Sequence, residues 1–514
     1  MWRIFLLELE QRTQKISLLD AGLDDLLKQH KAQVKKHGLT RLTLNRDQHP
    51  IRVTDFSRAA LRTCETLRNR GYEAYLVGGC IRDLLLGVKP KDYDIATNAT
   101  PEKVHAIFSS SRIIGRRFKI VHVIYGNELI EVTTFRAGES HNRKATVSDG
   151  HGMLVRDNTY GQDQSEDSER RDFTINALYF DPSDESITDF HGGLYDLNHG
   201  IIDIIGDPET RYAEDPVRMI RAVRFKAKLG FSLSKRTEKA IATQKSLLTN
   251  ISNARMFEEV NKLFLSGHGQ ASLKELIAYD LLRLLMPGQK SIIADSAFRE
   301  FVSHALESSD IRTARGQRNK PYFLYAVLLF TRVRSILEER NAAMGGDTVF
   351  SRNLIVEAAN KALDAQNTAT DIPTAIYFDI TELYVLYFSL FSPYHTREEI
   401  NELVKSQYFR ASYDLLKLRA YFEKELTPYV EFYAPYYDES ARLAEERRRK
   451  REERMAEKRR QKRESRDRSV KAARAPRGKE RKESADGYER DSAADRQERL
   501  ARARAWRIAM NLDP

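Results

Sequence analysis

The chain reads LVGGCIRD at residues 76–83 and KDYDI at residues 91–95. Two glycines between an apolar strand and a short helix let a ligand approach the backbone, and the free N–H groups at the helix N-terminus attract an anion. In an extended strand, Asp92 and Asp94 project to one side and Tyr93 to the other. Each pattern alone usually marks only a turn or a solvated strand face. Their order and spacing together favour a phosphate site beside two carboxylates, which suit a hard divalent cation.

A third carboxylate is expected near this pair. Glu131 lies between Ile130 and Val132, which form the buried face of a strand, so Glu131 points to the open face. A lone strand acid is more often simply exposed, but Asp92 and Asp94 are expected on the same open face. Three acids there could hold two metal ions, which polarise an attacking hydroxyl and neutralise leaving phosphates.

The surrounding segments predict an α+β head followed by helices. Apolar spacing, glycines and turns predict helices over 54–70 and 80–86, strands over 72–77, 93–96, 120–125 and 128–135, and a polar loop over 137–169. Strand signals return from 174 to about 205, and residues 214–430 follow a helical period. Residues 1–50 show no clear core face, so a frayed or helical extension is expected. The predicted fold is a small mixed or antiparallel sheet with helices, then an all-α neck and body.

The end of the chain carries all of the excess positive charge. The net charge is +11, and residues 441–514 hold 26 Lys and Arg against 15 Asp and Glu. Residues 442–482 have almost no apolar side chains, so they are expected to be disordered or a solvated helix. The pairs Glu445–Arg449 and Glu446–Lys450 favour the helix. The excess charge favours sequence-independent binding to RNA phosphates.

Several classes of protein are excluded by what the sequence lacks. Two cysteines, Cys64 and Cys80, cannot form a disulfide framework or a Cys-rich zinc site. No apolar run is long enough for a membrane span or a signal peptide. There is no GxxxxGK[ST] phosphate loop and no HExxH zinc motif. We therefore expect a soluble, cytoplasmic protein with no membrane partner.

Four motifs together resemble a known family. They are LVGGCIRDLLLG with KDYD from residue 76, GRRFKIVH from 115, RRDFTINAL from 170 and RYAEDPVRMIR from 211. These residues resemble the class II nucleotidyltransferase superfamily, which contains bacterial poly(A) polymerases and tRNA CCA-adding enzymes. The resemblance is strong over residues 72–265 and weaker to about 430. It implies a nucleotidyltransferase head and a polynucleotide nucleotidyltransferase activity.

The resemblance also implies roles for single residues. The implied catalytic acids are Asp92, Asp94, Glu131 and Asp172, of which the first three would bind two Mg²⁺ ions. The implied nucleotide-binding residues are Gly78, Gly79, Arg82, Arg171, Asn176, Asp215, Arg218 and Arg221. Arg171 and Asp172 would contact the ribose and phosphates and distinguish ATP from dATP. A structural ion pair is the alternative interpretation of residues 170–172.

Asp215 and its neighbours have a local interpretation as well. Asp215 is a good N-cap and Pro216 a good first residue of a helix. The family adds base selection, with Asp215 accepting from the base and Arg218 donating to it. Arg221 and Arg224 lie on about the same helix face and would contact the triphosphate or the primer. As a bare helix they would be a solvated stripe.

The subtype follows from other segments. GRRFKIVH, residues 408–420 and the basic tail resemble bacterial poly(A) polymerases more than CCA-adding enzymes. We therefore expect addition of AMP from ATP to the 3′ ends of mRNA and other transcripts. A CCA-adding enzyme and a non-catalytic RNA-binding protein on the same fold are the alternatives. The expected RNA-binding residues are Arg116, Arg117, Lys119, Arg224, Arg447, Arg448, Arg449 and Lys450.

The motifs divide the chain into five expected parts. These are an N-terminal extension at 1–54, a catalytic head at 55–205, a helical neck at 206–270, a helical body at 271–440 and a basic RNA-binding tail at 441–514. We expect a monomer, with RNA-decay proteins as candidate partners.

Overall fold

The structure is a computed structural model that describes residues 21–115, 119–137, 146–148, 154–157, 160–288, 294–343, 350–392 and 395–474. Contacts divide the chain into two compact units, Met1–Ala441 and Arg442–Pro514. Among the described residues, no helix is long and apolar enough to cross a membrane.

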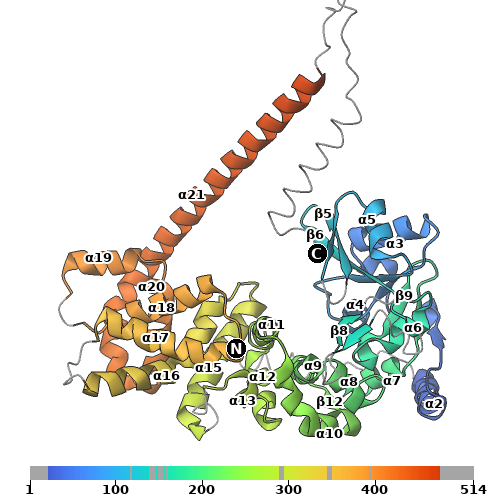
Figure 1. Ribbon diagram of the computed structural model, residues 1–514, viewed down its shortest axis with the longest axis horizontal. Helices are drawn as coiled ribbons and strands as arrows, with labels where there is room; N and C mark the ends of the chain where they lie inside the picture. Colours follow the sequence, from blue (N-terminus) through green and yellow to red (C-terminus); the bar gives the residue numbers. More distant parts are fainter. Residues whose placement is uncertain are drawn as a thin grey trace, which may run out of the picture. The chain divides into compact units, whose positions relative to one another are not determined.

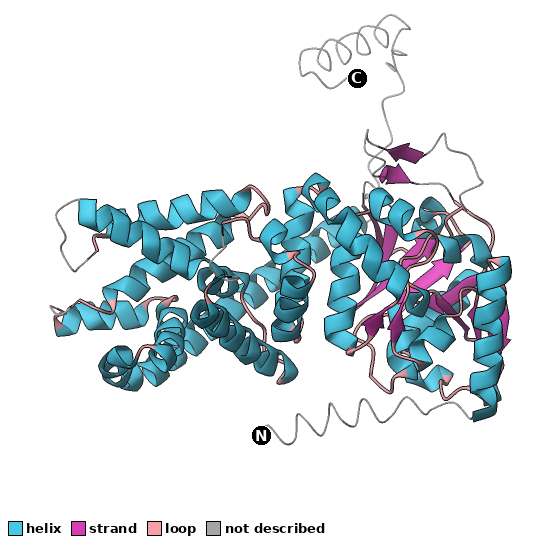
Figure 2. Cartoon of the chain, turned by 90° about the horizontal axis from the view of Figure 1, so that it is seen from below, coloured by secondary structure: helices cyan, strands magenta, loops and turns pink. Residues whose placement is uncertain are grey.

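An eight-stranded mixed sheet forms the centre of the head (Figures 1 and 2). The strand order is β1-β10-β9-β2-β3-β6-β5-β4, and within this sheet only β3 and β6 pair in parallel. The strands are β1 (Leu42–Leu44), β2 (Ala74–Val77), β3 (Asp94–Thr97), β4 (Ser111–Ile114), β5 (Ile120–Tyr125), β6 (Glu128–Thr134), β9 (Leu178–Asp181) and β10 (Ser186–Asp189). Two further strands, β7 (Thr146–Ser148) and β8 (Leu154–Asp157), form a separate hairpin.

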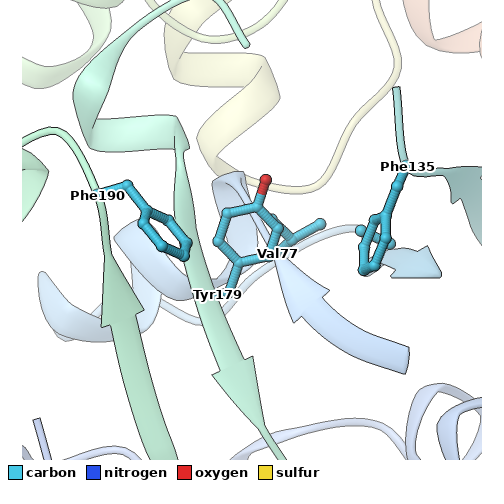
Figure 3. Packing of buried hydrophobic residues seen from close by; sticks show 5 residues of the cluster. Val77, Phe135, Tyr179 and Phe190 are labelled. Carbon is cyan, nitrogen blue, oxygen red and sulfur yellow. The ribbon is translucent and has the colours of Figure 1, made fainter. Parts of the chain in front are cut away.

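Helices cover the sheet and carry the loops of the site. They are α2 (Ala21–His37), α3 (Arg58–Arg68), α4 (Gly79–Leu85), α5 (Pro101–Ile107), α6 (Gln164–Glu169) and α7 (Gly193–Asn198), with 3₁₀ turns η1 (Arg46–Gln48), η2 (Val53–Asp55) and η4 (Thr174–Asn176). The helix α3 packs against β2, β3 and β6, and α4 packs against β2, β9 and η4. Side chains from several strands therefore meet in one apolar core, of which Figure 3 shows a cluster around Tyr179.

The remainder of the first unit is almost entirely helical. Its elements are β11 (Ile201–Ile202), α8 (Pro208–Glu214), α9 (Val217–Leu229), β12 (Ser232–Leu233), α10 (Lys235–Gln244), η5 (Lys245–Asn250), α11 (Asn253–Phe264), α12 (Gly269–Ala278), α13 (Leu282–Leu285), α15 (Ser296–Ala314), α16 (Pro321–Ala343), α17 (Arg352–Asn367), α18 (Thr374–Ser389), α19 (Arg397–Lys405), α20 (Phe409–Phe422) and η6 (Lys424–Leu426). The helix α21 (Thr427–Arg474) begins in the first unit and continues into the second.

Most elements expected from the sequence are confirmed, but the loop expected over 137–169 is wrong and one short helix was missed. The α+β head and the helical neck and body are present, with β5 at its predicted bounds. The segment 137–169 is not simply a loop, because it contains β7, β8 and α6. Its polar composition concealed them. The short helix α7 was not expected, since it begins after two glycines with few apolar residues.

The described part of the N-terminal segment, from residue 21 to 50, packs on the head rather than lacking a core face. Leu27 of α2 and Leu44 of β1 are fully buried, and β1 is the edge strand beside β10. Lys31 is also buried, with its Nζ 2.5 Å from Asp196 Oδ2 and 3.6 Å from Asp203. A buried cation needs such partners, and their distance in the sequence hid this contact.

The described part of the tail is a helix. The helix α21 continues to Arg474, which agrees with the solvated-helix alternative, and Lys450 pairs with Glu446 at 2.7 Å as the spacing predicted. Residues 475–514 lie outside the described part of the chain. The five-part division of the chain stays a prediction.

Candidate active site

Asp94 and Glu131 lie side by side on two adjacent strands. Asp94 is the first residue of β3, and the parallel register places it opposite Glu131 of β6. Asp92 is exposed just before β3, whereas Tyr93 and Ile95 are buried on the other side. The expected contrast between the more exposed acids and buried Tyr93 and Ile95 is present, although β3 itself begins only at Asp94. The acids belong to the part of the sheet where the chain leaves β2 for the Gly78-Gly79 turn.

The electrostatics of this cluster disfavour its full ionisation. The pKa of Asp94 is raised to about 6, first by burial and then by the negative charges of Glu131 and Asp92, while Arg171 and Arg221 oppose the shift. Carboxylates that raise one another's pKa are a common feature of metal and catalytic sites. A bound cation would relieve this repulsion.

The residues present fit Mg²⁺ as an ion shared with a substrate. Among the described residues, no three His, Cys, Asp or Glu side chains are gathered into a preformed metal cage. Mg²⁺ seldom uses an all-protein cage, because it keeps water and binds one or two carboxylates together with substrate phosphates. Glu131 has its Oε1 3.4 Å from His122 Nε2 of β5, the residue opposite it in the antiparallel register. The donor set is all oxygen from Asp92 and Asp94, with Glu131 adjacent.

Gly78 lies close to both Arg171 and Asp94. Its φ is +80°, a conformation that favours glycine. A Cβ at this position would lie 3.6 Å from Arg171 Nη1 and 3.9 Å from Asp94 Oδ2. Both are ordinary van der Waals distances, so the positive φ, rather than crowding, favours glycine at this position. The close approach of a ligand to the two glycines stays a prediction.

Three expected nucleotide-binding residues and the expected catalytic acid Asp172 form one hydrogen-bond chain. Arg82 Nη1 donates to Asn176 Oδ1 at 2.6 Å, and Asn176 Nδ2 donates to Asp172 Oδ1 at 3.1 Å. Arg221 of α9 donates to the other Asp172 oxygen. Arg82 is almost fully buried and also donates to Asp83. The structure therefore brings together α4, η4 and α9 through polar side chains.

Arg82 and Asp172 have protein partners where contacts to nucleotide were expected. Burial opposes ionisation of Asp172, but Arg221, Asn176 and the backbone N–H of Phe173 outweigh it and hold its pKa well below the usual range. The structural ion pair, the alternative interpretation of residues 170–172, is therefore present. Asp172 is an ionised junction between η4 and α9.

Asp215 and Arg218 are held by neighbours as well. Asp215 accepts two hydrogen bonds from Arg255 of α11, one from Nη1 at 2.9 Å and one from Nη2 at 2.8 Å. Arg218 Nη1 donates to Glu214 Oε2 at 3.0 Å. The Asp215 carboxylate also accepts from the Val217 N–H at 3.3 Å. The helix α9 nevertheless begins at Val217 with Pro216 as its N-cap, one residue later than predicted, so the expected N-cap role of Asp215 is wrong. The pair lies one turn apart as expected, with its donors and acceptors oriented by partners.

Three guanidinium groups surround the ring of Phe225. The Cζ atoms of Arg82, Arg221 and Arg224 lie 5.1, 5.6 and 5.0 Å from its centroid. Burial and the charge of Arg221 lower the pKa of Arg224, whose Nε is buried without a hydrogen-bond partner in the described structure. Lys228 of the same helix lies 3.3 Å from Asp83. This concentration of cations favours an anion nearby.

Sequence reasoning missed the residues that support the site. Asp167 and Tyr179 contact Arg171, Arg255 contacts Asp215, and His122 lies beside Glu131. The four-residue spacing of Asp167 and Arg171 was the only available signal. Arg255 is 40 residues from Asp215, so no local pattern pointed to it.

The expected RNA-binding residues are only partly described. Arg116 and Arg117 lie outside the described residues. Lys119 Nζ lies 2.9 Å from Glu102 Oε1. The side chains of Arg447, Arg448, Arg449 and Lys450 are exposed on α21. The exposed tail residues are accessible to a polyanion, and no contact to RNA is part of the structure.

Three family models match successive parts of the chain. The model described as "Poly A polymerase head domain" matches residues 74–203. "Probable RNA and SrmB- binding site of polymerase A" matches 230–293, and "Polymerase A arginine-rich C-terminus" matches 352–468. The matches cover the head, the helices that follow it and part of the basic tail.

Whole proteins give the same pattern. Poly(A) polymerase I of Salmonella typhimurium is 39% identical over 76% of this chain and 84% of its own length, and that of Haemophilus influenzae is 40% identical over 76% and 88%. The CCA-adding enzyme of Lactobacillus delbrueckii subsp. bulgaricus is 41% identical, but over 45% and 56%. A crystal structure of the Bacillus stearothermophilus CCA-adding enzyme in complex with CTP is 27% identical over 74% and 82%, with a TM-score of 0.50.

Proposed function

Because the chain belongs to the bacterial poly(A) polymerases of the tRNA nucleotidyltransferase family, which add AMP from ATP to RNA 3′ ends without a template, we propose that the acids at β3 and β6 are its catalytic centre. Asp92 and Asp94, with Glu131 beside them, would hold Mg²⁺. When bound, Mg²⁺ would polarise the attacking RNA hydroxyl and neutralise the leaving pyrophosphate.

One observation carries this proposal. Asp94 and Glu131 are register neighbours, and the pKa of Asp94 is raised by burial and then by the negative charges of Glu131 and Asp92, so negative charge is concentrated here. Repulsion between carboxylates lowers the stability of the fold unless a bound cation neutralises it. A Cβ at Gly78 would lie 3.6 Å from Arg171 Nη1 and 3.9 Å from Asp94 Oδ2, so a phosphate bound against this glycine would be close to both groups.

The chain's other residues would bind and orient the nucleotide. Gly78 and Gly79 leave room for the triphosphate, and Arg82, Arg171 and Arg221 supply positive charge around it. Asp172 and Asn176 would act from the junction that joins η4 to α9, close to the ribose. Arg82 and Asp172 already have protein partners, so their main contribution would be to fix the positions and charges of the residues around the triphosphate.

Base selection would fall to Asp215 and Arg218. Their carboxylate and guanidinium are oriented by Arg255 and Glu214, which limits the donor and acceptor pattern shown to a base. A fixed pattern suits the use of one nucleotide. The extent of the sequence similarity agrees: at about 40% identity, the poly(A) polymerase relatives match 76% of this chain, whereas the CCA-adding relative of Lactobacillus delbrueckii subsp. bulgaricus matches 45% of it.

RNA would be retained through its phosphates. The segment 230–293 matches a family model for RNA binding, and residues 441–514 carry the whole net charge of +11. Cationic helices bind single strands without reading their sequence. A tail of this kind suits an enzyme whose primers share only a 3′ end. Contact with RNA-decay proteins stays a prediction.

Metal-dependent AMP addition tests the proposed centre. Asp92→Ala and Asp94→Ala should each lower turnover at least about a hundredfold, the usual effect of losing a key electrostatic group. Binding of Mn²⁺ in the presence of ATP, followed by electron paramagnetic resonance, should weaken in parallel. Glu131→Gln is compared with Glu128→Gln on the same strand, which should leave both readouts unchanged. Normal metal dependence in active Asp94→Ala protein would refute the site.

A further inference from the structure

Asp167 and Tyr179 are buried polar residues with no assigned role in the chemistry. Asp167 belongs to α6 and Tyr179 to β9, and they are 4% and 1% exposed. A buried carboxylate and a buried phenol each need hydrogen-bond partners. Both find them in Arg171, which lies two residues after the end of α6 and begins the RDFTIN segment.

The three side chains form a closed set of hydrogen bonds. Arg171 donates to Asp167 Oδ2 from Nε at 3.2 Å and from Nη2 at 2.9 Å. Arg171 Nε also donates to the Tyr179 hydroxyl at 3.0 Å, and that hydroxyl donates to Asp167 Oδ2 at 2.7 Å. The other Asp167 oxygen accepts from the backbone N–H of Arg136 at 3.2 Å. Two nitrogens of the guanidinium are thereby fixed.

Tyr179 is itself held by apolar packing. Its ring belongs to a cluster with Val77, Ala96, Phe135 and Phe190, and Figure 3 shows its hydroxyl oxygen at the end of the ring away from the β9 backbone. The ring meets Phe190 edge-to-face, with centroids 6.2 Å apart. Arg171 Cζ lies 5.1 Å from the centre of the same ring. The Tyr179 hydroxyl oxygen, which accepts a hydrogen bond from Arg171 Nε, therefore has little freedom to move.

The remaining nitrogen faces the catalytic centre. Arg171 Nη1 lies 3.6 Å from where a Cβ of Gly78 would be, and Asp94 Oδ2 is 3.9 Å from that same point. We propose that Asp167 and Tyr179 are positioning residues, which orient the Arg171 guanidinium so that Nη1 meets a phosphate of the incoming ATP. This inference rests on the proposed function, in which Arg171 binds the nucleotide.

The charge of Arg171 supports the same role. Burial by itself lowers the pKa of a guanidinium, but Tyr179 and Asp167 outweigh it and the pKa of Arg171 is raised. The guanidinium is thus both oriented and kept cationic in a partly buried position. A bare surface arginine would have to lose side-chain freedom on binding, whereas an oriented one has already done so.

Tyr179→Phe is the decisive variant, because it keeps the ring and its packing and removes only the hydroxyl. We expect the KM for ATP to rise about three- to tenfold, the usual effect of one lost hydrogen bond, while the KM for the RNA primer stays unchanged. Asp167→Asn should raise the KM for ATP further. The matched control is Tyr75→Phe: Tyr75 packs on the same cluster, but its hydroxyl contacts only the exposed Glu73 among the described residues. Its KM for ATP should not change.

Arg171→Met separates this inference from the proposed function. If Arg171→Met raises the KM for ATP but Tyr179→Phe lowers only the melting temperature, then Tyr179 is structural and the positioning role is overturned. If Arg171→Met leaves the KM for ATP unchanged, the proposed nucleotide contact itself is wrong, and the inference falls with it. A rise in the KM for ATP in both variants, with the Tyr75→Phe control unchanged, supports both.

Discussion

Arg221 of α9 donates two hydrogen bonds to a single oxygen of Asp172, from Nε at 2.8 Å and from Nη2 at 2.5 Å. The other oxygen of Asp172 accepts from Asn176 and from the Phe173 backbone. This carboxylate thereby ties the RDFTIN segment of the head to the first long helix of the neck. The residues expected to read the nucleotide are therefore also the ones that join the two elements.

Arg221→Met should destabilise the protein at neutral pH. Removing one partner of a largely buried ion pair leaves the other uncompensated, which costs about 3 kcal/mol. The pKa of Asp172 is held below its usual range, so its contribution to stability is complete above about pH 4 and is lost as the pH falls below that value. The melting temperatures of wild type and Arg221→Met should thus converge in acid.

Arg224→Met is the matched control for this prediction. Arg224 lies one turn further along α9 and faces the same Phe225 ring, but its Nε is buried without a partner in the described structure. Its removal relieves repulsion with Arg221, so the melting temperature should change little at either pH. An equal loss of stability in both variants would contradict the role given to the Asp172 pair.

Asp94→Asn should stabilise the metal-free protein while abolishing activity. The pKa of Asp94 is raised to about 6, above its unfolded value, so the ionised group costs stability above pH 6 and the cost disappears as the pH falls toward 4. We expect a gain of roughly 1–3 kcal/mol at pH 7.5 and none at pH 4. Thermal melting in EDTA at both pH values measures this.

Asp92→Asn provides the comparison. Because Asp92 is exposed, the melting temperature of the Asp92→Asn variant should resemble that of wild type, although the activity of this variant also falls. If Asp94→Asn melted below wild type at pH 7.5, Asp94 would be a structural residue.

The sequence alone placed the acids correctly because strand alternation is a local property. Tyr93 and Ile95 had to be buried once the segment was a strand, which left Asp92 and Asp94 on the open side. The parallel pairing of Asp94 with Glu131 was not predicted, because strand order depends on tertiary contacts for which a single sequence has no local signal. Only the open face shared by the three acids was expected from the sequence.

The supporting residues could not be predicted in the same way. Arg255 contacts Asp215 from another helix, and Lys31 contacts Asp196 although the two residues are 165 positions apart in the sequence. Such pairs depend on tertiary packing, for which one sequence has no local signal. The helix α6 was missed for a different reason: its residues are polar, and the buried side of Asp167 faces an arginine rather than an apolar core.

The tail should determine salt-dependent RNA affinity but not turnover. Replacing Arg447, Arg448, Arg449 and Lys450 with Gln should reduce the salt slope of single-strand binding by up to about 3, since each lost phosphate contact contributes about 0.7. Removal of residues 442–514 should reduce it further. The rate at saturating primer should stay near wild type. Fluorescence anisotropy over a range of KCl concentrations gives the slope.

Replacing the acids of the same helix tests whether the effect is electrostatic. Glu445→Gln and Glu446→Gln should strengthen RNA binding, because they raise the positive charge of α21. An unchanged slope in the four-residue variant would show that the tail does not hold RNA phosphates.

Arg255→Met should relax the choice of nucleotide. Without the two hydrogen bonds from Arg255, the Asp215 carboxylate can turn and accept from a different base edge. We expect the ratio of kcat/KM for ATP over CTP to fall about three- to tenfold. Lys262→Met on the same helix, which removes a pair with Glu259, should leave the ratio unchanged. If both variants kept the wild-type ratio, the orientation of Asp215 would not determine base choice.

The central claim is that this chain uses Asp92 and Asp94 to add AMP to RNA without a template. Purified full-length protein should be incubated with an unrelated oligonucleotide RNA, or with a tRNA that lacks CCA, and with each nucleoside triphosphate separately. We predict that ATP alone gives long extension of the unrelated RNA, that CTP is used poorly, and that Asp94→Asn protein extends neither primer. Efficient completion of CCA on the tRNA, with no extension beyond it and none on the unrelated RNA, would contradict the account.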